Sequence, residues 1–284
     1  MNKTTGFATN NVRRYYERHT ARFLAYGQGG GVGAIHRAVW GPGVSTREQA
    51  FRFVENRLAD AIRTLQNQDN LIEVVDLGCG VGGSLCYLAG QLPIRGTGVT
   101  VSPLQARLAN ECIREIGLED RIQCREGDYS DPTLVLPVAD LVYAIESFVH
   151  GPEPGAFFSQ CARIVRPGGL LAVCDDMWRR GDDTKARRHV ARFKRGWHVH
   201  TLIDRKELRR LAGDAGFDHY STDDLTPHLE LQRPRDYALS LLTTLVGWFP
   251  ANDYLGHLTG GGALQTCLRH GWIGYDLALF RRAE

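Results

Sequence analysis

The sequence lacks the patterns that mark several large classes of protein. No apolar run approaches the length of a membrane span, and residues 1–16 hold no apolar core of a secretion signal. Neither sign of charge dominates, because the sequence has 34 Lys and Arg and 32 Asp and Glu, which gives a formal charge of +2. A nucleic-acid surface normally needs a basic excess, so nucleic acid is not an expected partner. We expect a cytoplasmic protein without a membrane span.

The seven cysteines also lack a pattern. No CxxC pair and no histidine-rich cluster occurs among them, and they stand at positions 79, 86, 112, 124, 161, 174 and 267. An odd number of cysteines scattered through expected strands and helices indicates reduced thiols rather than a disulfide framework or a structural zinc. We therefore expect no resident metal ion.

Short apolar runs alternate with helical patterns from residue 72 onward. The expected strands are "IEVVD", "GTGVTV", "IQCREGDY", "ADLVYAIES", "GGLLAVCDD", "AGFDHYSTDDL" and "GWIGYDLALFRR", and the helices between them are expected at 81–91, 103–117, 154–165, 182–196 and 204–214. This βαβ rhythm predicts an α/β fold with a doubly wound, mostly parallel, seven-stranded sheet. Its ligands should lie at the carboxyl ends of the strands.

Further helical patterns surround this core at 8–26, 46–67, near 233–247 and at 260–270. With no repeat and no low-complexity linker, the simplest organisation is one domain over 1–284. In it, 1–70 form an N-terminal helical cap, 71–176 a cofactor-binding core, and 177–284 lid insertions and the last strands.

The glycine-rich turn in "EVVDLGCGVGGSLCYLA", residues 73–89, would let a ligand approach the backbone, although a tight turn at this place can also serve packing alone. Gly78, Gly80 and Gly83 fit the spacing of a dinucleotide loop, whereas the lysine that a P-loop requires does not follow. Asp76 stands directly before the turn, at the end of an apolar strand. Its carboxylate would repel a pyrophosphate and suits a positively charged ligand, such as an ammonium beside a sulfonium.

Four segments, in order and correctly spaced, resemble class I S-adenosylmethionine (SAM)-dependent methyltransferases. They are "DLGCGVG" at 76–82, "GVTVSPLQ" at 98–105, "EGDY" at 126–129 and "IVRPGGLLAVCDD" at 164–176. The second is similar to the branch that methylates sterols, tocopherols and prenyl diphosphates, in which hydroxyl groups replace the usual acidic ribose ligand. The resemblance implies a SAM-dependent methyltransferase with cofactor contacts at Asp76, Gly78, Gly80, Thr100, Ser102, Gln105, Asp128 and Tyr129.

The fourth strand ends in "YAIESFVH" and lacks the Asn/Asp-Pro-Pro-aromatic segment of DNA and protein amide methyltransferases. Glu146 and His150 stand there instead, as candidate catalytic residues or as an ordinary backbone cap and a loop residue. "ESF", "HTLIDRKEL" at 200–208 and "DLTPHLELQR" at 224–233 are similar to segments of geranyl diphosphate C-methyltransferases. This resemblance implies an isoprenoid acceptor, with Glu146 as the base that removes a proton.

Such an acceptor passes through a carbocation, which aromatic rings stabilise without reacting. The candidate rings are Tyr16, Trp40, Phe148, Trp178 and Trp197, each of which could equally be core or lid packing. A diphosphate tail would need cations and Mg²⁺. The basic segment 179–195 could supply cations unless its arginines form a solvated face, and "RRYY" at 13–16 and His36 are rival contacts.

Two other functions remain open. The runner-up is an O- or C-methyltransferase of a phenolic or polyketide-like product, with His150 as the base. The third is a SAM-fold protein that binds cofactor without transferring methyl, such as a cyclase. All three take a small-molecule partner, and the sequence leaves open whether the chain forms a homo-oligomer.

Overall fold

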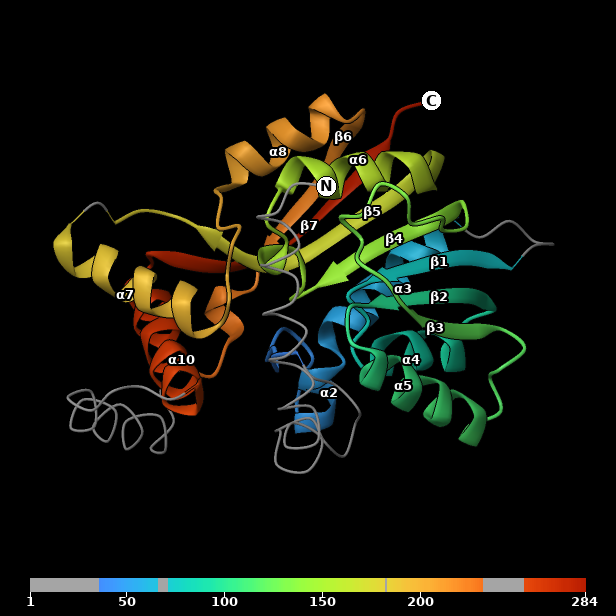
Figure 1. Cartoon of the computed structure of the whole chain (residues 1–284), viewed down its shortest axis with the longest axis horizontal. Coiled ribbons are helices and arrows are strands. Elements are labelled where there is room, and N and C mark those ends of the chain that lie inside the picture. The colour runs from blue at the N-terminus through green and yellow to red at the C-terminus, as the bar shows by residue number, and fades with distance from the viewer. Residues whose placement is uncertain (1–35, 66–70, 182, 232–252) are drawn as a thin grey trace.

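The computed structural model describes residues 36–65, 71–181, 183–231 and 253–284. Seven strands form one sheet in the order β3-β2-β1-β4-β5-β7-β6, which confirms the expected fold (Figure 1). Strands β1 to β5 run parallel, and β7 is antiparallel to both of its neighbours. The strands are β1 Ile72–Leu77, β2 Ile94–Thr100, β3 Ile122–Glu126, β4 Ala139–Ile145, β5 Val165–Trp178, β6 Phe217–Asp224 and β7 Ile273–Arg282.

The helices match the expected pattern with two differences. They are α2 Arg47–Phe51, α3 Phe53–Leu65, α4 Gly83–Gln91, α5 Pro103–Glu115, α6 Pro154–Ile164, α7 Thr184–Gly196, α8 Arg205–Asp214 and α10 Asp253–Arg269, with short 3₁₀ turns η2 Phe148–His150 and η3 Thr226–His228. The single helix expected at 46–67 is divided at Arg52 into α2 and α3. The helix expected at 260–270 begins earlier, at Asp253. The helices expected at 8–26 and near 233–247 lie outside the described residues.

Side-chain caps fix where several helices begin. Thr46, Ser102, Asp183 and Asp204 each accept a hydrogen bond from the backbone N–H three residues further on. Such a cap typically stabilises a helix by about 1 kcal/mol, because it satisfies an otherwise unpaired N–H group. The cap at Ser102 matters for the site, since it starts α5 directly after β2 and places Gln105 beside that strand end.

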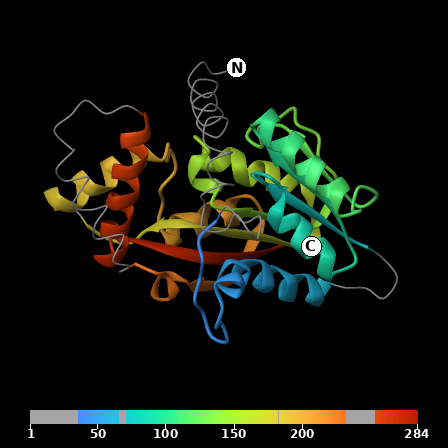
Figure 2. The ribbon, with the colours of Figure 1, turned by 90° about the horizontal axis from the view of Figure 1, so that it is seen from below.

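The helices cover both faces of the sheet. Apolar side chains of α3, α4 and α5 pack on one face, and those of α6 and α8 pack on the other. Val54, Leu58 and Ile62 of α3 are fully buried in the same cluster as Val74 and Leu141 of the central strands. Helix α3, expected in the N-terminal cap, therefore lies against the sheet (Figure 2). Its 3.6-residue periodicity indicated a buried face without indicating its partner.

Helices α7 and α10 lie side by side beyond one end of the sheet (Figures 1 and 2). They form a separate apolar cluster that includes Val149, Phe193, Cys267 and Trp272. This lobe belongs to the segment after residue 177 in which a lid is expected, and its role as a lid stays a prediction. Among the described helices, none is long and apolar enough to pass through a membrane.

Candidate active site

The glycine turn after β1 lies directly against the end of β4. Gly78, Gly80 and Gly82 all have positive φ, at 100°, 55° and 78°. A Cβ atom at Gly78 would come within 2.3 Å of the Cβ atom of Ser147, so only glycine fits there. The Ser147 hydroxyl also donates a hydrogen bond to the Leu77 carbonyl. The loop expected to hold the cofactor therefore touches the residue that follows Glu146.

Asp76 is buried on β1, with 4% of its surface exposed, beside Tyr143 in the β1–β4 register. Burial raises the pKa of its carboxyl to about 7, and the neighbouring Tyr143 hydroxyl opposes the shift only in part. A buried carboxylate of this kind gains strongly from a cationic ligand. Together with the glycine cradle, it fits the ammonium group of SAM.

The other expected cofactor residues gather at the ends of β2 and β3. The Thr100 hydroxyl donates to Oε1 of Gln105 over 2.7 Å, and the backbone N–H of Gln105 donates to Ser102 Oγ over 3.3 Å. The carboxylate of Asp128 accepts hydrogen bonds from the backbone and the hydroxyl of Ser130. These contacts hold the polar groups in place along the carboxyl edge of the parallel strands.

Tyr129 joins this edge to β4. Its hydroxyl donates to the carbonyl oxygen of Ser147 over 2.7 Å, and its ring packs edge-on against Phe157. The structure thus brings the cofactor residues expected on three different strands to one side of the glycine turn. Their roles in binding stay predictions.

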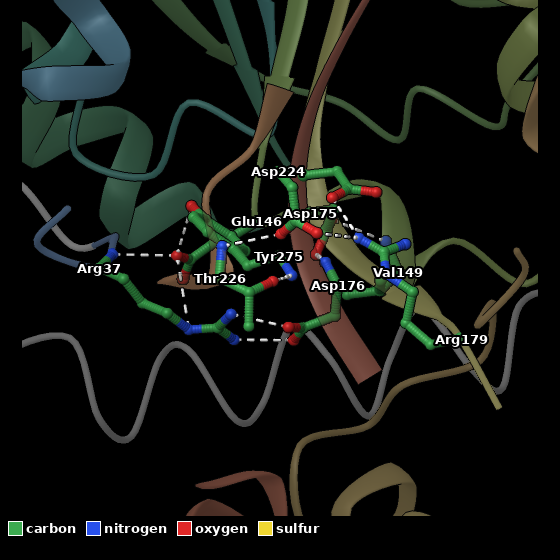
Figure 3. Close-up of polar contacts among 10 residues, drawn as sticks. Arg37, Glu146, Val149, Asp175, Asp176, Arg179, Asp224, Thr226 and Tyr275 are labelled. Carbon is green, nitrogen blue, oxygen red and sulfur yellow. Dashed lines mark hydrogen bonds and ion pairs between the residues drawn. The ribbon is translucent and has the colours of Figure 1, made fainter. Parts of the chain in front are cut away.

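Glu146 follows β4 with φ at 50°, a left-handed conformation that is uncommon outside glycine (Figure 3). Its Oε1 atom accepts hydrogen bonds from the backbone N–H of Arg37 and from the hydroxyl of Tyr275, both at 2.9 Å. No residue in the described ranges donates to Oε2. The side chain is 18% exposed, and two donors hold its Oε1 atom.

Arg37 is fixed in turn by Asp176 of β5. Its two Nη atoms meet the two carboxylate oxygens of Asp176 at 2.7 Å each, and its guanidinium lies 4.7 Å from the ring centroid of Tyr275. Burial raises the pKa of Asp176, and the Arg37 guanidinium opposes that shift. A bidentate pair of this geometry is strong and directional. Arg37, β4, β5 and β7 therefore converge on Glu146.

His36 ties the same segment to α3. Its Nε2 atom lies 2.8 Å from Oε1 of Glu55, and its Nδ1 atom lies 3.2 Å from the carbonyl oxygen of Arg37. Glu55 also accepts hydrogen bonds from Arg52 and from Ser84 in the first turn of α4. Burial opposes the charge on His36, but the Glu55 carboxylate raises its pKa to about 9. Both ring nitrogens of His36 therefore have partners within the chain, and its expected contact with an acceptor stays a prediction.

His150 lies in η2 at the boundary between sheet and lid. Its Nδ1 atom is 3.2 Å from the carbonyl oxygen of His198, another residue with positive φ. Burial lowers the pKa of His150 to about 4, so its imidazole is neutral near pH 7. A neutral imidazole can accept a proton, which keeps His150 as the alternative base.

Two of the aromatic rings that were candidates to face a cation pack against other aromatic rings. Phe148 is 1% exposed and packs edge-on against Phe157 and Phe158, at centroid distances of 5.0 and 6.0 Å. Trp197 lies in the lid, 6.4 Å from the ring centroid of Phe193. The ring of Phe148 thus packs in the core, and the ring of Trp197 packs in the lobe formed by α7 and α10.

The remaining expected substrate residues have mixed positions. Trp40 donates its backbone N–H to His228 over 2.7 Å, and its indole nitrogen is buried without a partner among the described residues. The half-buried Trp178 ends β5 and donates its backbone N–H to Ile203. Tyr16 and the rest of "RRYY" lie outside the described residues. Three arginines of α7 are exposed, as expected if the basic segment forms a solvated face: Arg188, Arg192 and Arg195.

Sequence reasoning missed Arg37, Asp176 and Tyr275. Asp176 carried a signal, because it is a polar residue near the carboxyl end of a buried parallel strand. Tyr275 carried no such signal, since β7 runs antiparallel and brings its amino-terminal end, not its carboxyl end, to this edge. Arg37 contacts Glu146 through its backbone N–H and through an ion pair from Nε at 3.8 Å, and it stands outside the motifs that the sequence offered.

Comparisons with known proteins agree with this geometry. Residues 75–173 match the family described as "Methyltransferase domain". A probable tocopherol O-methyltransferase of Oryza sativa subsp. japonica is 35% identical over 127 residues, which are 45% of this chain and 35% of that protein. The chain thus spans about a third of the length of this relative.

Two solved structures share the fold over nearly the whole chain. Geranyl diphosphate C-methyltransferase from Streptomyces coelicolor A3(2) has a TM-score of 0.72 at 21% identity and covers 97% of this chain and 98% of its own. The [4+2]-cyclase SpnF has a TM-score of 0.70 at 22% identity, with 96% and 95% covered. Sequence motifs, sheet order and family match agree, and the chain carries a class I SAM-dependent methyltransferase domain.

Proposed function

We propose that this protein transfers the methyl group of SAM to a carbon atom of a small lipophilic acceptor, most specifically an isoprenoid such as a prenyl diphosphate, with Glu146 as the base. The observation that carries the proposal is the arrangement of Glu146. Its partly exposed carboxylate follows β4, beside the glycine turn, and two donors hold its Oε1 atom.

Bound SAM supplies an electrophilic methyl group, and the chain supplies binding, orientation and a base. Asp76 and the glycine turn would hold the amino-acid end of SAM, and Thr100, Ser102 and Gln105 the ribose. An alkene acceptor that gains a methyl cation becomes a carbocation, which must lose a proton to become an alkene again. We assign that proton to Glu146, because its carboxylate lies at the carboxyl edge of the sheet beside the glycine turn.

The isoprenoid part of the proposal draws support from the motif resemblance and from a structural neighbour whose title names geranyl diphosphate. The guanidinium of Arg37 is held by both oxygens of Asp176, so it is not free to bind a diphosphate. Within the described ranges, no group of three or more His, Cys, Asp or Glu could hold a metal ion.

A second candidate is O-methylation of a phenol with His150 as the base. The imidazole of His150 is neutral near pH 7 and so can accept the proton of a hydroxyl, although a pKa of about 4 makes it a weak base. The similarity to a probable tocopherol O-methyltransferase points to the same acceptor class. The third alternative, binding of cofactor without methyl transfer, is represented among the structural neighbours by a [4+2]-cyclase.

The test is incubation with labelled SAM and a panel of prenyl diphosphates, phenols and sterols, with and without Mg²⁺. We expect a C-methylated isoprenoid, and we expect Glu146→Gln to bind S-adenosylhomocysteine normally while its kcat falls by roughly 10²- to 10⁴-fold. Glu207→Gln, on the exposed face of α8, is the matched control. Unchanged turnover in Glu146→Gln would remove Glu146 as the base and favour His150. Cofactor binding without S-adenosylhomocysteine formation over the whole panel would favour the third alternative.

A further inference from the structure

We propose that Tyr275 and Arg37 are positioning residues that hold Oε1 of Glu146 and so reserve Oε2 as the single proton-accepting atom. The proposal rests on the proposed function, in which Glu146 is the base. It adds two residues that touch neither cofactor nor acceptor and act through Glu146 alone.

Both donors are held rigidly. Tyr275 is fully buried on β7, and its ring is covered by the guanidinium of Arg37 at 4.7 Å. Arg37 is locked by its two hydrogen bonds to Asp176, so its backbone N–H has little freedom to move. Two rigid donors at 2.9 Å on one oxygen fix both the position and the rotation of the Glu146 carboxylate (Figure 3).

The backbone of Glu146 agrees with this role. A non-glycine residue with φ near 50° is strained, and such residues cluster where geometry is imposed by function. The Glu146 N–H donates to the carbonyl oxygen of Cys174 over 2.9 Å, which anchors the strained residue to β5. The main chain and Oε1 are both fixed, and only Oε2 remains for the acceptor.

A fixed oxygen has a chemical consequence. The carbocation left on the acceptor can lose a proton from any carbon that flanks the cationic centre. When Oε2 takes one of these protons, the electron pair of that C–H bond becomes the new C=C bond, and Glu146 later releases the proton to solvent. One immobile oxygen selects one flanking carbon and gives one alkene isomer. A carboxylate free to rotate would reach several and give a mixture.

The central experiment is Tyr275→Phe, which removes a single oxygen atom. We expect kcat to fall by about 10- to 100-fold, in line with the loss of one hydrogen bond to a charged group. Binding of S-adenosylhomocysteine should be unchanged, and the product should become a mixture of alkene isomers. Tyr87→Phe is the matched control, because it removes a hydroxyl that donates to Asn56 over 2.9 Å far from Glu146. A Tyr275→Phe enzyme with normal kcat and one product isomer would overturn the proposal.

Arg37→Lys provides a second variant should Tyr275→Phe fold poorly. It keeps the backbone N–H and the charge but cannot form the two parallel hydrogen bonds to Asp176. We expect a smaller loss of kcat with the same mixture of isomers. Arg57→Lys, which alters an exposed ion pair with Asp223, is its control. A single isomer at normal kcat in Arg37→Lys would remove Arg37 from the proposal.

A double-mutant cycle separates this proposal from the function on which it rests. If Glu146→Gln keeps normal turnover, the proposed base is wrong. If Glu146→Gln loses turnover, Tyr275→Phe should add little further loss in that background, because its effect passes through Glu146. Equal factors in both backgrounds would show that Tyr275 acts only through general stability, and would overturn the positioning role alone.

Discussion

The backbone N–H of Arg37 donates to Glu146 over 2.9 Å, although the two residues are 109 positions apart in the chain. The side chain of the same arginine meets Asp176 on the neighbouring parallel strand. A segment outside the sheet thus completes the environment of a residue at its edge.

Gly78→Ala should lose both stability and cofactor binding. The new Cβ would overlap Ser147 at 2.3 Å, and alanine is strained at φ of 100°. We expect about 2–4 kcal/mol of lost unfolding free energy, from overpacking added to backbone strain. Gly43→Ala is the control, because its φ is +81° but nothing lies within 4 Å, so it should lose only about 1 kcal/mol. Denaturant unfolding and calorimetry with S-adenosylhomocysteine measure both effects, and equal losses in the two variants would contradict the close approach to Ser147.

Cofactor affinity should rise as pH rises through 7. Burial raises the pKa of Asp76 to about 7, and its carboxyl must release a proton before it can pair with an ammonium group. Below that pH the Kd for S-adenosylhomocysteine should increase by up to about tenfold for each pH unit. Calorimetry on both sides of the pKa measures this slope. Asp76→Asn should bind weakly and lose the slope, whereas a slope that survives the substitution would assign it to another group.

Stability should fall in alkaline solution because of His36. The Glu55 carboxylate outweighs burial and raises the pKa of His36 from 6.5 to about 9. The folded state therefore holds this proton more tightly than the unfolded state does. The resulting stabilisation is complete below pH 6.5, is lost as pH rises through 9, and amounts to at most about 3 kcal/mol.

Denaturant unfolding over this pH range tests the role of His36. His36→Gln should flatten the alkaline fall in unfolding free energy. His219→Gln, at an exposed position of β6, should keep it. If both variants behave like the parent protein, the His36–Glu55 pair does not control this loss.

Phe148→Leu should lower stability without slowing methyl transfer. The ring packs edge-on against Phe157 and Phe158 in the core, so the smaller side chain should cost about 1–1.5 kcal/mol of unfolding free energy. Phe157→Leu is the matched comparison and should behave alike. A much larger loss of kcat in Phe148→Leu alone, at saturating acceptor, would return Phe148 to the acceptor site.

The sequence predicted the sheet because its central strands are short and almost wholly buried, so they read as continuous apolar runs. It did not predict the break at Arg52, since the helical spacing of Phe51, Val54 and Leu58 runs straight through it. Nor could periodicity show that α3 packs on the sheet, because it identifies a buried face and not the surface that covers it.

The candidate site divides in the same way. Asp76 and Glu146 were predictable because parallel strands bring their carboxyl ends to one edge of the sheet. Tyr275 was not predictable. It lies on β7, which runs antiparallel to β5 and therefore brings its amino-terminal end to this edge of the sheet. The aromatic residues were the least predictable, because a ring that could face a cation and a ring that fills a core have the same sequence signature.

His36 and Arg37 are neighbours in the chain, yet their side chains are anchored in different layers, one on Glu55 of α3 and the other on Asp176 of β5. A single peptide bond therefore separates the two residues that form these ion pairs. Moving this segment away from the sheet would separate both ion pairs, so the two contacts together oppose its displacement.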